Sequence, residues 1–110
     1  MKHETKVPLY NISIFMTNKL NALNKRIRKD VSDYDGGSKC YGRCTVWSDA
    51  DFKMHIGIYA SSLPIISHEA VHAANDIFDK IGQKPDLRND ECYAYLVEWI
   101  VKEFIEHIDI

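Results

Sequence analysis

The sequence predicts an α+β fold in which helices pack on a small antiparallel sheet, with the elements in the order β-α-β-β-α-α. Three observations support this prediction. Short segments rich in β-branched and aromatic residues occupy much of the N-terminal half. Two longer segments with helical spacing of apolar residues follow them, and clusters of Gly, Asp and Pro separate the elements. The length suits one domain, 1–110.

The N-terminal half is expected to hold three strands and one helix. Residues 7–16 alternate loosely and carry Val, Ile, Tyr and Phe, which indicates a first strand. A helix is expected at 17–29, where Thr17 or Asn18 is the capping residue. Residues 43–48 and 52–60 then indicate two strands joined by a tight turn.

The C-terminal half is expected to form two amphipathic helices. The first covers residues 65–81, with Pro64 in its first turn and Gly82 as its C-terminal cap. The second runs from Asn89 or Asp90 to about His107. One arc of the first helix is apolar and is expected to be buried. This arc holds Ile66, Ala70, Val71, Ala73, Ala74, Ile77, Phe78 and Ile81.

Composition and charge exclude several classes of function. Hydrophobic residues make up 45% of the chain, charged residues 27%, and the net charge is -2, as in an ordinary soluble globular protein. We therefore expect no nucleic-acid partner and no membrane partner; a basic face within residues 19–29 is the one feature that would favour nucleic acid. The first residues lack the apolar stretch of a secretion signal, which favours a cytoplasmic location.

Three cysteines argue against a disulfide framework, because the number is odd. Cys40 and Cys44 are separated by three residues, and Cys92 stands alone. A structural zinc site needs four ligands, and no second cysteine pair is present. We therefore expect free thiols at Cys40 and Cys44, with a disulfide or a zinc site between them as lesser alternatives.

The most informative segment is His68-Glu69-Ala70-Val71-His72, an H-E-x-x-H motif. On a helix, His68 and His72 lie one turn apart, so both imidazoles reach the same metal ion. Glu69 projects beside them, where a carboxylate can take a proton from a metal-activated water. The motif falls on the polar arc, opposite the apolar residues. Its alternative explanation is an exposed histidine pair on a solvated helix face.

Catalytic zinc requires a third protein ligand, and Glu91 at the start of the last helix is the expected one. Asp90 on the same helix, or Asp76 and Asp79 on the motif helix, are alternative carboxylates. This context resembles the gluzincins, zinc metallopeptidases in which a glutamate ligand follows the H-E-x-x-H motif on a later helix. Ser67-His68-Glu69-Ala70-Val71-His72-Ala73-Ala74 with the downstream Asn89-Asp90-Glu91 also resembles small zincin-like proteins encoded by bacteriophages. The resemblance covers residues 56–104.

The resemblance implies a minimal zincin-like fold and a set of roles. His68, His72 and Glu91 would bind Zn²⁺, and Glu69 would be the general base in peptide-bond hydrolysis. The edge of strand 52–60 would hold an extended peptide, with His55 and Tyr59 contacting the substrate. No second domain is available to stabilise the oxyanion, so Tyr95 is expected to do so. Tyr93, Arg88 and His55 are the alternatives for that role, and the zinc ion alone is a further one.

The expected function is therefore zinc-dependent hydrolysis of a peptide or protein substrate, in the host cytoplasm if the chain is phage-encoded. The alternative is a binding protein that keeps zinc on a metallopeptidase scaffold without turnover. The intact Glu69 counts against that alternative, because a structural zinc site does not need this carboxylate. The oligomeric state is left open.

Overall fold

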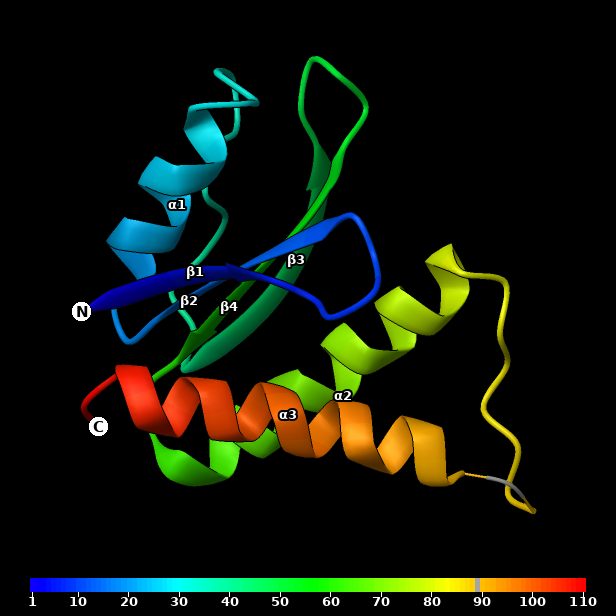
Figure 1. Ribbon diagram of the computed structural model, residues 1–110. Helices are drawn as coiled ribbons and strands as arrows, with labels where there is room; N and C mark the ends of the chain where they lie inside the picture. The colour runs from blue at the N-terminus through cyan, green and yellow to red at the C-terminus, as the bar shows by residue number, and fades with distance from the viewer. Residues whose placement is uncertain (89) are drawn as a thin grey trace.

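The computed structural model describes residues 1–88 and 90–110, which form strands and helices in the order β-β-α-β-β-α-α (Figure 1). This arrangement confirms the α+β class. The strands and helices are β1 (Lys2–Lys6), β2 (Ile12–Thr17), α1 (Leu20–Arg28), β3 (Gly42–Ser48), β4 (Met54–Ala60), α2 (Leu63–Lys80) and α3 (Glu91–His107).

The sheet is mixed, so the prediction of an antiparallel sheet was wrong. Its strand order is β1-β2-β4-β3. β1 pairs antiparallel with β2, and β3 pairs antiparallel with β4, but β2 and β4 run parallel. The segment between the two parallel strands contains α1, the connection 29–41 and β3. β3 begins at the end of the sheet where β2 ends and runs antiparallel to it, so β4, which reverses direction again, runs parallel to β2.

β1 was missed because its sequence has no apolar pattern. The segment is Lys2-His3-Glu4-Thr5-Lys6, and its exposed positions alternate with half-buried ones. It is an edge strand that joins the sheet through its backbone pairing with β2. Charged side chains are common on edge strands because they discourage further pairing. Of the strand predicted over 7–16, residues 12–16 belong to β2, and residues 7–11 form the connection between β1 and β2.

Both faces of the sheet are covered by helices, α2 and α3 on one side and α1 on the other (Figure 1). Every residue of β2 and of β4 is therefore buried, although alternate side chains point to opposite faces. The larger core lies under α2 and α3, and the smaller core lies under α1. The smaller one contains Phe15, Leu23, Ile27, Trp47 and Tyr59.

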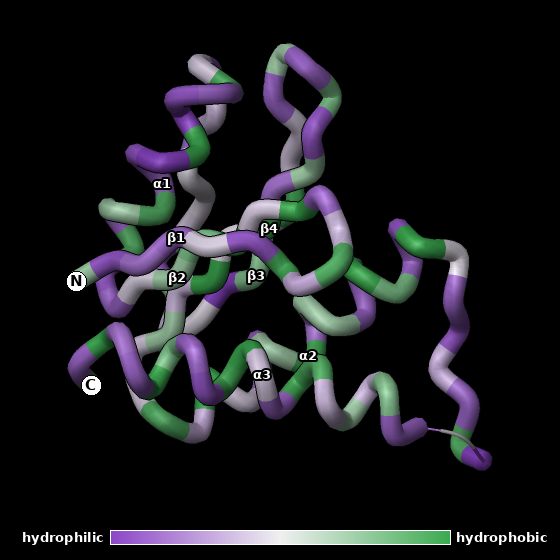
Figure 2. Tube along the Cα trace, viewed as in Figure 1, coloured by the Kyte–Doolittle hydropathy of each residue, from purple (hydrophilic) through white to green (hydrophobic). Residues whose placement is uncertain are grey.

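α2 and α3 agree closely with their predicted ranges, whereas α1 begins only at Leu20, with Lys19 at the N-cap position instead of Thr17 or Asn18. Thr17 is the last residue of β2. α2 begins two residues earlier than expected, with Pro64 in its first turn, and α3 begins directly after Asp90. Gly82 follows α2 with a φ of 75°, the left-handed conformation that favours glycine after a helix. Asn89, the other predicted cap, lies outside the described residues. In Figure 2 hydrophilic and hydrophobic residues alternate along α2 and α3, as expected for helices that bury one face.

Within the described part of the chain, none of the helices combines the length and the apolar character that crossing a membrane requires.

Candidate metal centre

The first half of α2 brings His68, Glu69 and His72 together. The Nε2 atoms of the two histidines lie 3.3 Å apart. One ligand atom from each of the three side chains lies within 4.8 Å of the others. Both imidazoles are exposed to solvent. The spacing of the motif on one helix therefore produces the convergence that was predicted, and these residues offer a donor set that a divalent metal ion can use.

Glu69 is buried, whereas the sequence placed it on the polar side of the helix with the histidines. Only 5% of Glu69 is exposed. Gly42, the first residue of β3, packs directly against the Glu69 side chain. A methyl group added at Gly42 would clash with Ile65 and would lie 3.3 Å from Cγ of Glu69. The missing side chain at Gly42 therefore lets the strand approach α2 and cover the Glu69 carboxylate.

The covered carboxylate is not fully paired. Its Oε2 atom is buried and has no hydrogen-bond partner among the described residues. A buried polar atom without a partner costs about 1–3 kcal/mol, and such atoms are rare in folded proteins. A cation, or a molecule that donates a hydrogen bond, would satisfy it. Two imidazole nitrogens and one carboxylate fit zinc, which prefers nitrogen ligands together with carboxylate oxygen or sulfur.

The next turn of α2 carries Asp76, which pairs with β3 and is not part of the ligand cluster. The Cys44 thiol donates a hydrogen bond to Oδ2 of Asp76 across 3.7 Å. Burial raises the pKa of Asp76, while the thiol and His72 oppose this shift. Burial, followed by the charges of Asp76 and Glu69, strongly raises the pKa of Cys44, which favours the neutral thiol. Asp79, the other acid of α2 considered as a ligand, also lies outside the cluster.

The three cysteines are free thiols, which confirms the expectation for Cys40 and Cys44.

Glu91 is not brought to the histidines. It is the exposed first residue of α3, and its carboxylate is not among the ligand atoms that meet around His68 and His72 in the described residues. Two positions further along α3, the Tyr93 hydroxyl lies 2.9 Å from Oδ1 of Asn75 and 3.2 Å from the carbonyl oxygen of Val71. α2 and α3 run in opposite directions in Figure 1, and Tyr93 also packs against Phe78, so the start of α3 lies beside the C-terminal half of α2. The predicted third ligand is therefore separated from the first two.

The same packing explains two other departures from the sequence prediction. Val71 was expected in the buried arc, but it is 40% exposed. Tyr95, the first choice for stabilising an oxyanion, lies on the solvent side of α3 with 65% of its surface exposed. Tyr93, an alternative for that role, is hydrogen-bonded to the turn of α2 that carries His72. Burial raises the pKa of Tyr93, which keeps its phenol protonated.

The substrate-binding roles predicted for His55 and Tyr59 were based on the wrong face of the sheet. Both side chains point toward α1, away from α2, and only 6% of His55 is exposed. Its Nε2 atom lies 2.9 Å from Oδ2 of Asp49, and its ring stacks on Trp47. β4 is also an interior strand, paired on both sides, so it has no edge for a peptide. The free edge nearest α2 belongs to β3.

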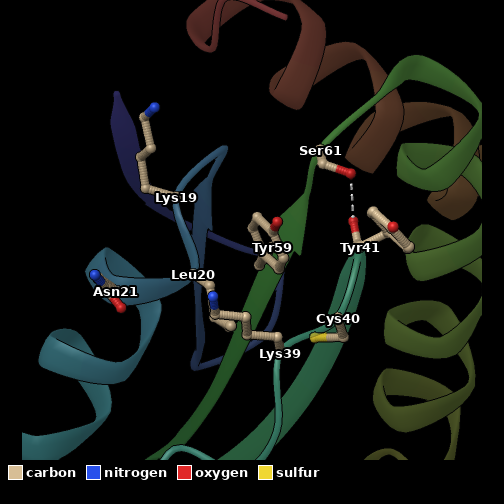
Figure 3. A pocket seen from close by; sticks show the side chains of 8 residues that line it. All are labelled: Lys19, Leu20, Asn21, Lys39, Cys40, Tyr41, Tyr59 and Ser61. Atoms are coloured by element: carbon tan, nitrogen blue, oxygen red, sulfur yellow. Dashed lines mark hydrogen bonds between the residues drawn. The ribbon is translucent and has the colours of Figure 1, made fainter.

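Two hollows adjoin the start of β3. One, of about 420 Å³, is lined by Tyr41, Gly42, Pro64, Ile65, His68 and Glu69. The other, of about 750 Å³, lies between the start of α1, the segment that leads into β3 and the end of β4 (Figure 3). It is lined by Lys19, Leu20, Asn21, Lys39, Cys40, Tyr41, Tyr59 and Ser61. Tyr41 borders both hollows, and its carbonyl oxygen accepts a 2.7 Å hydrogen bond from the Ser61 hydroxyl.

A second group of side chains could also hold a metal ion, although the sequence did not point to it. It consists of His3, Glu103 and His107, whose ligand atoms also lie within 4.8 Å of one another. Glu103 and His107 are four positions apart on α3, a local spacing that signals a shared helix face. No local pattern could have added His3, because it comes from β1 at the other end of the chain.

Comparison with known proteins adds no relative: no protein-family model, no curated protein and no solved structure matches this chain. The resemblance to gluzincins therefore rests on the sequence motif alone.

Proposed function

We propose that this protein is a zinc-dependent hydrolase that acts on peptide bonds, with the first half of α2 as its active site. The observation that carries the proposal is the Glu69 carboxylate. It is buried beside two exposed imidazoles, and its Oε2 atom has no partner among the described residues. A surface histidine pair would not need a buried acid between its members, whereas a hydrolytic site uses one for proton transfer.

Each side chain has a distinct role in this proposal. His68 and His72 would hold the metal through their Nε2 atoms. Zinc, when bound, polarises a carbonyl oxygen and lowers the pKa of water. Glu69 would accept a proton from the attacking water and transfer it to the leaving amine. The cover provided by Gly42 holds this carboxylate in place and limits its hydration.

The substrate is proposed to be an extended peptide that adds to the free edge of β3. This edge runs past the motif, because Gly42 at its start lies over Glu69. Backbone hydrogen bonds along such an edge hold a peptide of varied sequence. The hollow of about 420 Å³ would then receive one side chain. Pro64, Ile65 and Tyr41 line it, so an apolar side chain fits best.

Glu91, the predicted third zinc ligand, is not among the residues that meet around His68 and His72 in the described part of the chain. Glu91 reaches the histidines only if the first turn of α3 moves toward the N-terminal half of α2, which requires the contacts of Tyr93 with Val71 and Asn75 to break. This separation favours a second candidate function, a zinc-containing binding protein without turnover. The three free cysteines fit a reducing compartment, and we propose a cytoplasmic location for either function.

The test combines metal content with activity. Purified wild-type protein is expected to contain zinc at the α2 site, and His68→Ala is expected to lose it. Glu69→Gln should keep the metal and lose cleavage of a peptide library by about 100-fold or more. Glu91→Gln should release zinc if Glu91 is a ligand. Glu98→Gln, an exposed glutamate on the same helix, is its matched control.

Each outcome separates the candidates. Zinc at this site with no cleavage of any peptide in the library would leave the binding protein as the function. Cleavage that survives Glu69→Gln would exclude the proposed role of this carboxylate. A wild-type protein that takes up no zinc at His68 and His72 would overturn both candidates.

A further inference from the structure

The first strand and the last helix meet at a cluster of two histidines and one glutamate. Nε2 of His3, on β1, lies 3.2 Å from Oε2 of Glu103. Nδ1 of His107, at the end of α3, lies 3.1 Å from the same oxygen. In Figure 1 the beginning of β1 and the end of α3 lie on the same side of the molecule. The cluster is separate from the motif on α2, whose ligand atoms form their own group.

The two imidazoles are held in a defined arrangement. Their rings are parallel to within 1°, and their centroids are 3.7 Å apart. Each ring turns one nitrogen toward Oε2 of Glu103, and Nδ1 of His107 also lies 2.9 Å from the backbone carbonyl oxygen of Glu103. The three ligand atoms are therefore close together, but the in-plane lone pairs of parallel rings do not meet at one point, so at least one imidazole must rotate about its side-chain bonds to bind the same ion. His3 is fixed by the pairing of β1 with β2, and the other two residues share one face of α3. Ligands on strands and helices are positioned better than ligands on loops.

We propose that this cluster is a second metal site, which binds one Zn²⁺ ion through His3, Glu103 and His107. Two imidazole nitrogens and one carboxylate oxygen favour zinc and related first-row transition metals over Mg²⁺ and Ca²⁺, which prefer oxygen ligands. The side chains of His3 and Glu103 are 20% and 22% exposed, and that of His107 is 42% exposed, so the ion has a path from solvent.

A metal at this position would link the two ends of the chain. β1 is an edge strand made of polar residues, and its buried apolar contribution to the core is small. A bound ion would join it to α3 and stabilise the folded state, because the ligands come together only when the protein is folded. This role is independent of hydrolysis on α2.

The experiment isolates the second site. The double variant His68→Ala/His72→Ala removes the α2 ligands and leaves His3, Glu103 and His107 in place. Titration of this metal-free variant with Zn²⁺ in a calorimeter is expected to show one equivalent. Adding Glu103→Gln or His107→Ala should weaken binding at least about tenfold, a change of roughly 1.4 kcal/mol. Glu106→Gln is the matched control, an exposed glutamate on the same helix that pairs with Lys102.

A second measurement addresses the link between the chain ends. Zn²⁺ is expected to raise the thermal midpoint of the double variant and to slow hydrogen exchange of the β1 amides. Adding His3→Ala should remove both effects. If that variant does not fold, the same two measurements on the double variant with Glu103→Gln or His107→Ala added test whether Zn²⁺ links β1 to α3. The proposal is overturned if the double variant takes up no Zn²⁺, or if uptake is unchanged by Glu103→Gln. The cluster would then be a hydrogen-bonded contact between β1 and α3.

Discussion

Two histidine–carboxylate clusters lie on opposite faces of the sheet, and they differ in how completely their polar atoms are paired. Under α1, His55 is buried and contacts Asp49, while its ring stacks on Trp47. On α2, both histidines are exposed and Oε2 of Glu69 has no partner among the described residues. The comparison teaches that burial alone does not identify a functional group. An unpaired buried carboxylate beside exposed imidazoles does distinguish a site that needs a ligand from a network that stabilises the fold.

The carboxylates of the cluster under α1, Asp30 and Asp49, have several hydrogen-bond partners. Oδ2 of Asp30 accepts a 2.8 Å hydrogen bond from Nε1 of Trp47 and a 2.9 Å hydrogen bond from Arg26. Arg26 also donates to Glu4 on β1 at 2.7 Å. The hydrogen bond from Trp47 is the largest cause that lowers the pKa of Asp30, and the contact with His55 is the largest that lowers the pKa of Asp49. These groups are therefore paired in the charged state, which is the signature of a structural network.

The largest expected difference in the free energy of unfolding is between alanine substitutions of a histidine in each of the two clusters. His55→Ala should lower the free energy of unfolding by about 2–4 kcal/mol, because it opens a cavity and leaves Asp49 without its side-chain partner. His68→Ala should change it by less than about 0.5 kcal/mol in metal-free buffer, as for other exposed positions. Urea unfolding of both variants measures the difference. Equal losses would show that the two clusters play the same structural role.

Gly42→Ala tests the cover over Glu69. The added methyl group clashes with Ile65, and overpacking of this kind costs about 1–3 kcal/mol. Zn²⁺ binding by α2 should weaken at the same time, because the strand must move away from Glu69. Gly82→Ala is the control: its φ is 75°, so it carries backbone strain, but a methyl group there meets no atom within 4 Å. A Gly82→Ala variant that impairs Zn²⁺ binding as much as Gly42→Ala would contradict this explanation.

Glu69→Met, unlike Gly42→Ala, is expected to stabilise the folded protein. Replacing an unpaired buried carboxylate by an apolar side chain of similar size is expected to raise the free energy of unfolding by about 1 kcal/mol in metal-free buffer. Asp30→Leu, which removes a fully paired carboxylate, should lower it instead. Thermal and urea unfolding of the two variants provide the comparison. A loss of stability in Glu69→Met would mean that the carboxylate already has a partner in the free protein.

The smallest effect is expected from pH. The folded state lowers the pKa values of Asp30 and Asp49, so their contribution is fully present above the ordinary carboxyl range near pH 4. It is lost as the pH falls below that range through the lowered values. Urea midpoints between about pH 6 and pH 3 should therefore decline less in Asp30→Asn than in the wild type. A parallel decline in both would show that Asp30 does not contribute to the acid sensitivity.

The predicted site residues that the structure does not bring to the motif share one cause. His55, Tyr59 and Glu91 were placed by assumptions about how one element faces another. Strand 52–60 alternates as predicted, but no local pattern indicates that a helix would cover each face of it. Glu91 opens α3 as predicted, yet the level at which α3 packs against α2 depends on contacts such as that between Tyr93 and Phe78. Such contacts depend on side-chain shape across elements, which leaves no repeat in the sequence.

The sequence by itself determined the elements whose information is local. The period of apolar residues defined α2 and α3, and the four-residue spacing brought His68 and His72 together on one helix face, because helix geometry fixes that relation wherever the helix lies. Only the tertiary structure decided the parallel pairing of β2 with β4, the burial of Glu69 under Gly42, and the meeting of His3 with Glu103 and His107. Each of these joins residues far apart in the chain, and the direction in which elements pack, rather than any local propensity, brings them into contact.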